Sequence, residues 1–243
     1  MKRHDGGIPF YIQVAETLRR RMATRDYPEG SLLPSTEELE REFGVSEITI
    51  RKALALLTKE GMLQRRRGLG TIVAKGPREL VTMELSGQFD RLVRLVESLP
   101  TDLQVLEVGI VPCPHHVADS LRLEPGSPVW RMKKLRRHDG SPLCHYLHYS
   151  RPELCQGITR DAAEKKNFVD VFREATGLNL VTLEQRLEAS SADTELSSLL
   201  RVRFGAPLLF LENLFIAAGE EHVLLTQIHY RADRCTVKAR TPL

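Results

Sequence analysis

The chain of 243 residues lacks the uninterrupted apolar run of about 18 residues that a membrane-spanning helix requires. No apolar stretch follows its first seven residues, so its beginning does not resemble a secretion signal. It has only four cysteines, and they lie too far apart to suggest a disulfide framework, which a protein of this length does not need. We therefore expect reduced thiols, no contact with a membrane and a cytoplasmic location.

The sequence also lacks the motifs that carry enzyme chemistry. It contains no glycine-rich phosphate loop, no nucleophile motif and no acid and base pair with the spacing of an enzyme family. Residues that bind metals gather in two places, which are Cys113, His115 and His116, and then His145 and His148. Their spacing matches no recognised zinc pattern. We therefore predict no catalytic residue, no metal ion and no cofactor.

What the sequence does contain is the composition of an ordinary globular protein, with 42% hydrophobic and 28% charged residues and enough length for two domains. Its net charge is +3, and the basic excess lies in the N-terminal third. Residues 1–77 carry 14 basic and 10 acidic side chains, whereas residues 78–243 carry 21 and 22. A nucleic-acid partner favours this distribution, although charge alone fits a chance imbalance equally well.

Three helical patterns follow one another in the basic third. The spacing of apolar residues predicts one helix over residues 11–22, a second after Ser35 and a third after Ser46. Ser35 and Glu38 have the spacing of a capping box. Gly44 suits the end of the second helix, and Ser46 suits the cap of the third. Two helices separated by so short a step predict a helix-turn-helix.

Two short strands are expected to follow these helices. The pattern predicts strands over residues 62–65 and 71–73, joined by a basic tip that contains Arg67 and Gly68. A tip of this kind suits contact with phosphates or entry into a minor groove.

These segments together resemble the DNA-binding domain of GntR-family transcription regulators. The residues that carry the resemblance over about 65 positions are Leu33-Pro34-Ser35, Phe43-Gly44-Val45-Ser46, Thr49-Ile50-Arg51-Lys52-Ala53-Leu54, Glu60-Gly61 and Gly68-Leu69-Gly70-Thr71. A leading helix, a helix-turn-helix and a wing in this order make it specific. The DNA contacts that the resemblance implies are Ser46, Thr49, Arg51, Arg67 and Gly68. The alternative is a winged helix that contacts another protein.

Two acidic residues depart from the family's pattern. Family members commonly carry arginine at the positions of Glu37 and Glu47, and arginine commonly reads guanine. A carboxylate instead accepts a hydrogen bond from the N4 amino group of cytosine, and it repels phosphates. Glu37 and Glu47 therefore join the predicted DNA-reading residues, and the operator is expected to differ from the usual one. A simpler role for Glu47 is to stabilise the start of its helix.

A short polar segment broken by Gly-Pro predicts a linker over residues 76–82, between a DNA-binding domain over 1–75 and a second domain over 83–243. The second domain contains two similar units, each with a short helix, a turn and a hairpin. The two hairpins turn at Gly140 and Gly219. We expect two pseudo-symmetric halves around one antiparallel sheet.

The second domain is similar to the UTRA effector domain, which accompanies such DNA-binding domains and shares the fold of chorismate lyase. The segments that carry the similarity over about 165 residues are Gly126-Ser127-Pro128-Val129, Asp139-Gly140-Ser141-Pro142, Gly205-Ala206-Pro207-Leu208 and Tyr230-Arg231-Ala232-Asp233-Arg234. The chain is thus identified as a GntR-family regulator with a UTRA-type domain, of the HutC-like subfamily. The implied fold class is α+β, a winged helix-turn-helix followed by an antiparallel-sheet domain with helices.

The resemblance places a small effector between the two halves of this domain. The anion-binding positions that it implies are Ser86, Gly87, Gln88, Lys134 and Arg136. The first three begin a helix predicted over residues 89–99, and the two cations lie two apart on a strand and so point to one side. A helix N-terminus with two cations suits a phosphate or a carboxylate. The alternative is a solvated edge strand whose charges discourage aggregation.

Further pocket positions also come from the resemblance. A glutamate common in the family's first hairpin is Tyr146 here, and one in the last hairpin is Leu224. Asn167 and Tyr230 align with other pocket positions. The loss of both carboxylates favours an anionic, partly apolar effector over a sugar or an amine.

The favoured function is a ligand-responsive transcription regulator, a repressor by family default, that binds a palindromic operator as a homodimer. One recognition helix reads only a half-site, so a palindrome requires two-fold symmetry. The alternatives are an enzyme of the chorismate lyase type and a scaffold whose winged helix binds protein. The sequence places the pairing surface beyond residue 78 and no more closely.

Overall fold

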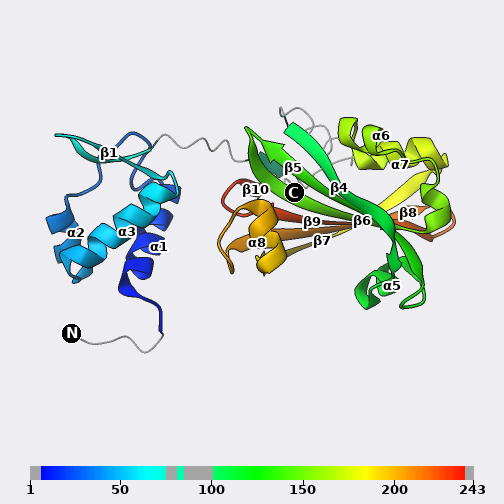
Figure 1. The fold of residues 1–243 in the computed structure, drawn as a ribbon, viewed down its shortest axis with the longest axis horizontal. Coiled ribbons are helices and arrows are strands. Elements are labelled where there is room, and N and C mark those ends of the chain that lie inside the picture. The colour runs from blue at the N-terminus through cyan, green and yellow to red at the C-terminus, as the bar shows by residue number, and fades with distance from the viewer. Residues whose placement is uncertain (1–6, 75–80, 85–100, 239–243) are drawn as a thin grey trace, which may run out of the picture. The chain divides into compact units, whose positions relative to one another are not determined.

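The computed structural model describes residues 7–74, 81–84 and 101–238 (Figure 1). The chain divides into two compact units, Met1–Arg78 and Glu79–Leu243, and each is described by itself. The linker predicted over residues 76–82 extends past this division, because Val81 and Thr82 begin a strand of the second unit. The helix predicted over residues 89–99 lies outside the described residues.

The first unit is a winged helix-turn-helix. Its elements are α1 (Phe10–Ala23), α2 (Thr36–Phe43), α3 (Glu47–Lys59), β1 (Leu63–Arg66) and β2 (Gly70–Val73). The two strands pair as an antiparallel hairpin, which is the wing. The helices enclose a core in which Leu18, Leu39 and Leu57 are fully buried. Apolar residues at helical spacing thus face inward on all three helices.

Local signals set the helix boundaries. Ser35 Oγ accepts a hydrogen bond from Glu38 N at 3.2 Å, and Ser35 N donates to the Glu38 carboxylate at 2.7 Å, which confirms the capping box. Gly44 ends α2 with a left-handed φ of 63°. Ser46 is the N-cap residue of α3, as predicted, but its side chain makes no capping hydrogen bond to a backbone N–H of α3 in the described structure. The hydroxyl of Ser46 instead lies 3.0 Å from the hydroxyl of Thr49. This side-chain hydrogen bond competes with a hydrogen bond between Ser46 and the backbone.

The second unit is built on a six-stranded antiparallel sheet with the strand order β4-β5-β6-β9-β8-β7. Its strands are β4 (Thr101–Pro112), β5 (Pro128–His138), β6 (Ser141–Ser150), β7 (Leu180–Ser191), β8 (Pro207–Ala217) and β9 (Glu221–Arg231). β6 and β9 lie side by side at the centre, so β4-β5-β6 and β7-β8-β9 are equivalent halves. Each half is a strand, a short helix and a hairpin, as the sequence predicted.

Helices cover both faces of this sheet (Figure 1). The helices of the second unit are α5 (His115–Leu121), η1 (Pro152–Cys155), α6 (Arg160–Lys165), α7 (Phe168–Thr176) and α8 (Thr194–Leu200). Met132 of β5 packs with Phe172 of α7, and we call this side the α7 face. Leu135 of β5 packs with Leu200 of α8 on the opposite side, the α8 face, which α5 also covers. The sequence did not predict η1 or α6, which are too short for a periodic pattern.

A small parallel sheet joins the beginning and the end of the second unit. β3 (Val81–Glu84) pairs with β10 (Cys235–Lys238). Val81 is buried and belongs to the same core cluster as Tyr146 and Tyr230. This pairing therefore adds a layer over the α7 face, beside two of the predicted effector residues.

Candidate functional site

The exposed side of α3 is the first candidate surface. Four apolar residues of α3 are buried in the core of the first unit, namely Ile50, Ala53, Leu54 and Leu57. Ser46, Glu47 and Arg51 are exposed and Thr49 is half-buried. The predicted α3 contacts thus lie along one helix on the side away from the core. Glu37 is also exposed, in the first turn of α2.

Glu47 and Arg51 form an ion pair across one turn of α3. Their side chains are 50% and 64% exposed, so the pair contributes at most about 0.5 kcal/mol and is easily exchanged for another contact. The two residues therefore act together, because the carboxylate of Glu47 neutralises the guanidinium of Arg51. The sequence interpretation treated them separately, although their spacing of four residues signals the pair.

The tip of the wing is the second part of this surface. Arg66 stands opposite Gly70 across the hairpin, and the backbone N–H of Leu69 donates to the carbonyl of Arg66 at 3.1 Å. Gly68 has a left-handed φ of 81°, which side chains disfavour. Arg67 and Gly68 are both exposed. The tip therefore presents cations beside a backbone that phosphates can approach closely.

The candidate effector site lies on the α7 face of the second unit. Lys134 and Arg136 reach it from β5, Tyr146 from β6 and Tyr230 from β9. Lys134 stands directly opposite Tyr146 in the strand register, and the guanidinium carbon of Arg136 lies 5.8 Å from the centre of the Tyr146 ring. The structure thus brings four of the predicted effector residues together.

The alternative of a solvated edge strand is wrong. β5 is an interior strand between β4 and β6, and Lys134 and Arg136 are 2% and 6% exposed. Lys133 and Arg137 alternate to the other side of the strand, where they form ion pairs with surface carboxylates. Only the inward-pointing pair of cations is therefore buried beneath the α7 face.

Burial sets the charge of Lys134. Its Nζ donates a hydrogen bond to the carbonyl of Ala163 at 2.5 Å and lies 5.8 Å from the ring centre of Phe168. Burial and then the charge of Arg136 lower the pKa of Lys134 from 10.5 to about 7, against a smaller opposite effect of Glu164. No described carboxylate lies within ion-pair distance of this ammonium group. An incoming anion would favour its charged form.

Arg136 keeps its charge for a different reason. Burial opposes the charge, but interactions with Tyr146, Cys144 and Tyr230 outweigh it and raise the pKa of Arg136. Burial also raises the pKa of both tyrosines, so that they remain neutral hydroxyl groups. The cluster therefore offers one fixed cation, one titratable cation and two hydroxyls.

His148 is a buried residue of this cluster that the sequence did not assign to the effector. Its ring centre lies 4.1 Å from that of Phe168, and its Nδ1 is 3.0 Å from Thr226 Oγ1. Its Nε2 is buried and has no hydrogen-bond partner in the described part of the chain. Burial and then the charge of Lys134 lower the pKa of His148, so the ring is neutral. The sequence did offer a signal for His148, because it lies two residues after Tyr146 on the same strand and therefore points to the same face.

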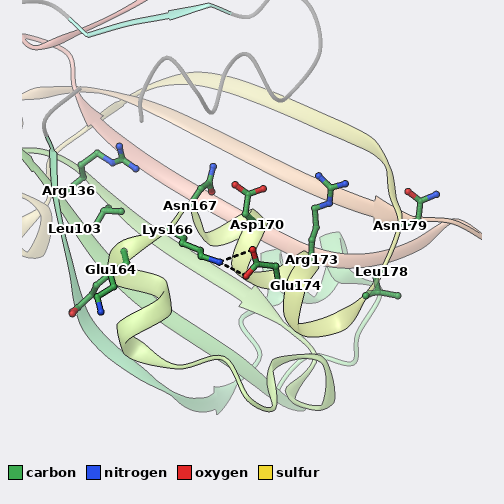
Figure 2. A pocket seen from close by; sticks show the side chains of 12 residues that line it. Leu103, Arg136, Glu164, Lys166, Asn167, Asp170, Arg173, Glu174, Leu178 and Asn179 are labelled. Carbon is green, nitrogen blue, oxygen red and sulfur yellow. Dashed lines mark hydrogen bonds and ion pairs between the residues drawn. The ribbon is translucent and has the colours of Figure 1, made fainter. Parts of the chain in front are cut away.

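A cleft of about 870 Å³ opens over α6 and α7. Figure 2 shows Arg136 and Leu103 at one end of it and Leu178 and Asn179 at the other. Of the predicted effector residues that the structure describes, only Arg136 and Asn167 line the cleft. The buried cluster therefore meets the cleft at Arg136.

The walls of the cleft carry charges of both signs. Lys166 pairs with Glu174 at 2.7 Å, and Asp170 and Arg173 also line it. Asn167 has a structural role, because its Oδ1 accepts a hydrogen bond from Val169 N at 2.9 Å and so caps α7. The remaining predicted positions, Ser86, Gly87 and Gln88, lie outside the described residues.

The residues considered as metal ligands do not come together. His145 and His148 point to opposite faces of β6, because they lie three residues apart on one strand. Cys113 is buried among apolar residues around α5. The described residues contain no group of three or more His, Cys, Asp or Glu that could hold a metal ion. Within that same part of the chain, no helix has the length and apolar character needed to cross a membrane.

Comparison with known proteins decides the family. The family model of the UTRA domain matches residues 99–236, and that of the bacterial regulatory proteins of the gntR family matches residues 10–73. The chain belongs to the GntR family and carries a UTRA domain. It is therefore a transcriptional regulator with a DNA-binding unit and an effector-binding unit, consistent with the HutC-like subfamily.

Two relatives match this GntR-family protein over most of the length of both chains. It is 30% identical to the transcriptional regulator PhnF of Escherichia coli over 86% of both chains. It is 24% identical to the transcriptional repressor NagR of Bacillus subtilis over 94% of this chain and 93% of that one. The crystal structure of PhnF from Mycobacterium smegmatis superposes with a TM-score of 0.58 at 19% identity, covering 94% of this chain and 99% of that one, and so shares the fold. These proteins are regulators and not enzymes.

Proposed function

We propose that this GntR-family protein is a repressor that binds a palindromic operator as a homodimer and responds to a small anionic effector held at Lys134 and Arg136. The observation that carries the effector is the burial of two neighbouring cations on one face of an interior strand. Burying a cation costs free energy, and an apolar side chain at either position would avoid that cost. A bound anion would offset the cost of burying these two cations, whereas packing alone does not account for their burial.

The surroundings of the two cations define the effector further. Tyr146 and Tyr230 supply hydroxyl groups, and the ring of Phe168 lies beside both Lys134 and His148. Cations and hydroxyls suit a phosphate or carboxylate, and aromatic rings suit an apolar portion. The absence of a carboxylate at positions 146 and 224 disfavours an amine or a sugar as the group held there.

The first unit supports binding to DNA as a dimer. Its α3 exposes polar residues and its wing exposes cations, as in a helix-turn-helix docked in a major groove. One such helix reads one half-site, so two copies fit a palindrome. NagR, a relative over most of the chain, is named a repressor, which supports the same direction of regulation. A regulator of this kind acts on the chromosome, and we place it in the cytoplasm.

The effector is tested with two matched variants. The operator is first selected from genomic fragments, and its binding is followed by fluorescence anisotropy while phosphate monoesters and carboxylic acids are added one at a time. Arg136→Gln should abolish the response and keep DNA binding. Arg137→Gln, which changes the neighbouring cation that points to the other side, should keep both.

Two results would contradict the proposed site. One is a response that requires a cationic ligand, and the other is an equal loss of response in both variants. Because Trp130 is the only tryptophan and lies in the core of the second unit, its fluorescence verifies that each variant is folded.

A further inference from the structure

Ile48 is an apolar side chain exposed among polar ones at the start of α3. It is 67% exposed, more than any other large apolar residue in the described part of the first unit. Its neighbours along the helix, Glu47 and Thr49, are polar. Ile48 lies outside the apolar cluster that forms the core of this unit. Packing within the unit therefore does not explain an isoleucine at this position.

Helix formation does not explain Ile48 either. Isoleucine is β-branched, which restricts its side chain in a helix and lowers its helix propensity below that of alanine or lysine. At an exposed position, either of those residues would stabilise α3 more. The same restriction is useful in binding, because a side chain that already prefers one rotamer loses little entropy when it contacts another molecule. Ile48 is thus better suited to recognition than to the stability of its helix.

The position of Ile48 on α3 directs it away from the core. Each residue of an α-helix is rotated by about 100° from the one before it, so Ile48 lies about 200° around the helix from Ile50. Ile50 is fully buried, whereas Lys52, one turn after Ile48, is exposed on the same side as Ile48. A helix-turn-helix turns this side of its second helix toward the major groove, and the first turn of that helix contacts base edges. Ile48 therefore lies where bases are read.

We propose that Ile48 reads one thymine in each half-site of the operator by packing against the C5 methyl group of that base. In the major groove only thymine presents this methyl group, and apolar side chains contact it. Such a contact adds apolar readout to the polar contacts expected of Glu47 and Arg51. The inference rests on the operator binding of the proposed function, and it names one base of that operator.

Thr49 also carries a methyl group, but its position suits this contact less well. It is half-buried, and its hydroxyl lies 3.0 Å from the hydroxyl of Ser46. Being next to Ile50 in the sequence, it lies only about 100° around the helix from that buried residue. The apolar contact is therefore assigned to Ile48. Thr49→Ser, which removes the methyl group and keeps the hydroxyl, is the matched control.

Replacement of thymidine by deoxyuridine, which lacks only the C5 methyl group, tests the contact directly. Each thymidine of the selected operator is replaced in turn, alone and together with its counterpart in the other half-site. The affinity of the full-length protein is followed by fluorescence anisotropy at low salt, where phosphate contacts keep weak binding measurable. At the position that Ile48 reads, the wild-type protein should bind about fourfold more weakly for one replacement and about fifteenfold for two. Ile48→Ala should bind the replaced and unreplaced operators equally.

The variants decide which residue makes the contact. Thr49→Ser should keep the wild-type ratio between the two operators, whatever its own affinity. A wild-type protein that responds to no thymine methyl group, or a loss of equal size in Ile48→Ala, would overturn the assignment. A loss that disappears in Thr49→Ser would transfer the contact to Thr49 and also overturn it. In these outcomes the proposed function stands, because operator binding and the effector response are measured on the unreplaced operator. A protein that selects no operator would overturn both.

Discussion

Replacing Lys134 by methionine should stabilise the second unit. Lys134 is 2% exposed, and its pKa falls from 10.5 to about 7 on folding. Below pH 7 the folded protein holds this charge in a buried place, and the shift of about 3.5 units corresponds to a cost of about 5 kcal/mol. Methionine has a similar length and no charge, so it removes this cost. It also removes the hydrogen bond to Ala163, a loss of about 1–3 kcal/mol that does not depend on pH.

The sign and the pH dependence follow from this linkage. Because the folded state binds fewer protons than the unfolded state between pH 7 and pH 10.5, the wild-type protein gains stability from Lys134 as the pH rises. The advantage of Lys134→Met should therefore be greatest at pH 6 and about 3 kcal/mol smaller at pH 9. The same variant should lose its response to the effector.

Urea unfolding followed by the fluorescence of Trp130 measures this difference. Trp130 stacks on Phe168 at 5.6 Å and reports on the second unit alone, which avoids the two-state problem of a chain with two units. Lys133→Met is the matched control, since Lys133 is half-buried on the α8 face and pairs with Glu195. It should cost about 1 kcal/mol or less at every pH. A Lys134→Met variant that is less stable than wild type at pH 6, or whose advantage does not shrink by pH 9, would refute the reasoning.

Three other predictions address the DNA-binding surface and the α8 face. Glu47→Gln frees Arg51 and should raise DNA affinity about threefold and steepen its salt dependence. The control Asp161→Asn breaks an exposed ion pair of the same i,i+4 spacing on α6 of the second unit and should change neither quantity. Arg67→Ala should lower the slope of affinity against salt by about one, and an unchanged slope would remove the wing from the interface. Burial lowers the pKa of His145 from 6.5 to about 4, so the second unit should lose about 3 kcal/mol as the pH falls through this range. His145→Phe should flatten that part of the urea-unfolding profile.

The sequence predicted the elements whose signals lie within a few residues of one another. The capping box of Ser35 and Glu38 formed as expected, and Asp139 and Gly140 both have positive φ in the hairpin turn between β5 and β6. Such features need no knowledge of distant segments. The same holds for the equivalence of the two halves, which was visible as a repeated order of helix, turn and hairpin.

Features that depend on distant segments were missed or left open. β3 pairs with β10 although Val81 and its partner Cys235 lie far apart in the sequence, and no local pattern announces a parallel pair of this kind. The sequence left a solvated edge strand open as the alternative for the charged residues of β5, because the interior position of β5 depends on β4 and β6 pairing with both of its sides. The sequence therefore named Lys134 and Arg136 but did not establish that they are buried.

The face of β5 that carries these cations shows where packing gives way to ligand binding. Along this face the chain reads Trp130, Met132, Lys134 and Arg136, and all four are buried. The first two belong to the apolar core beneath α7, as their chemistry requires. The next two side chains on this face are the cations of Lys134 and Arg136, at positions where the same alternation would place apolar side chains. A sequence selected for stability alone would keep the apolar pattern, so the change from Met132 to Lys134 marks the point at which the site begins.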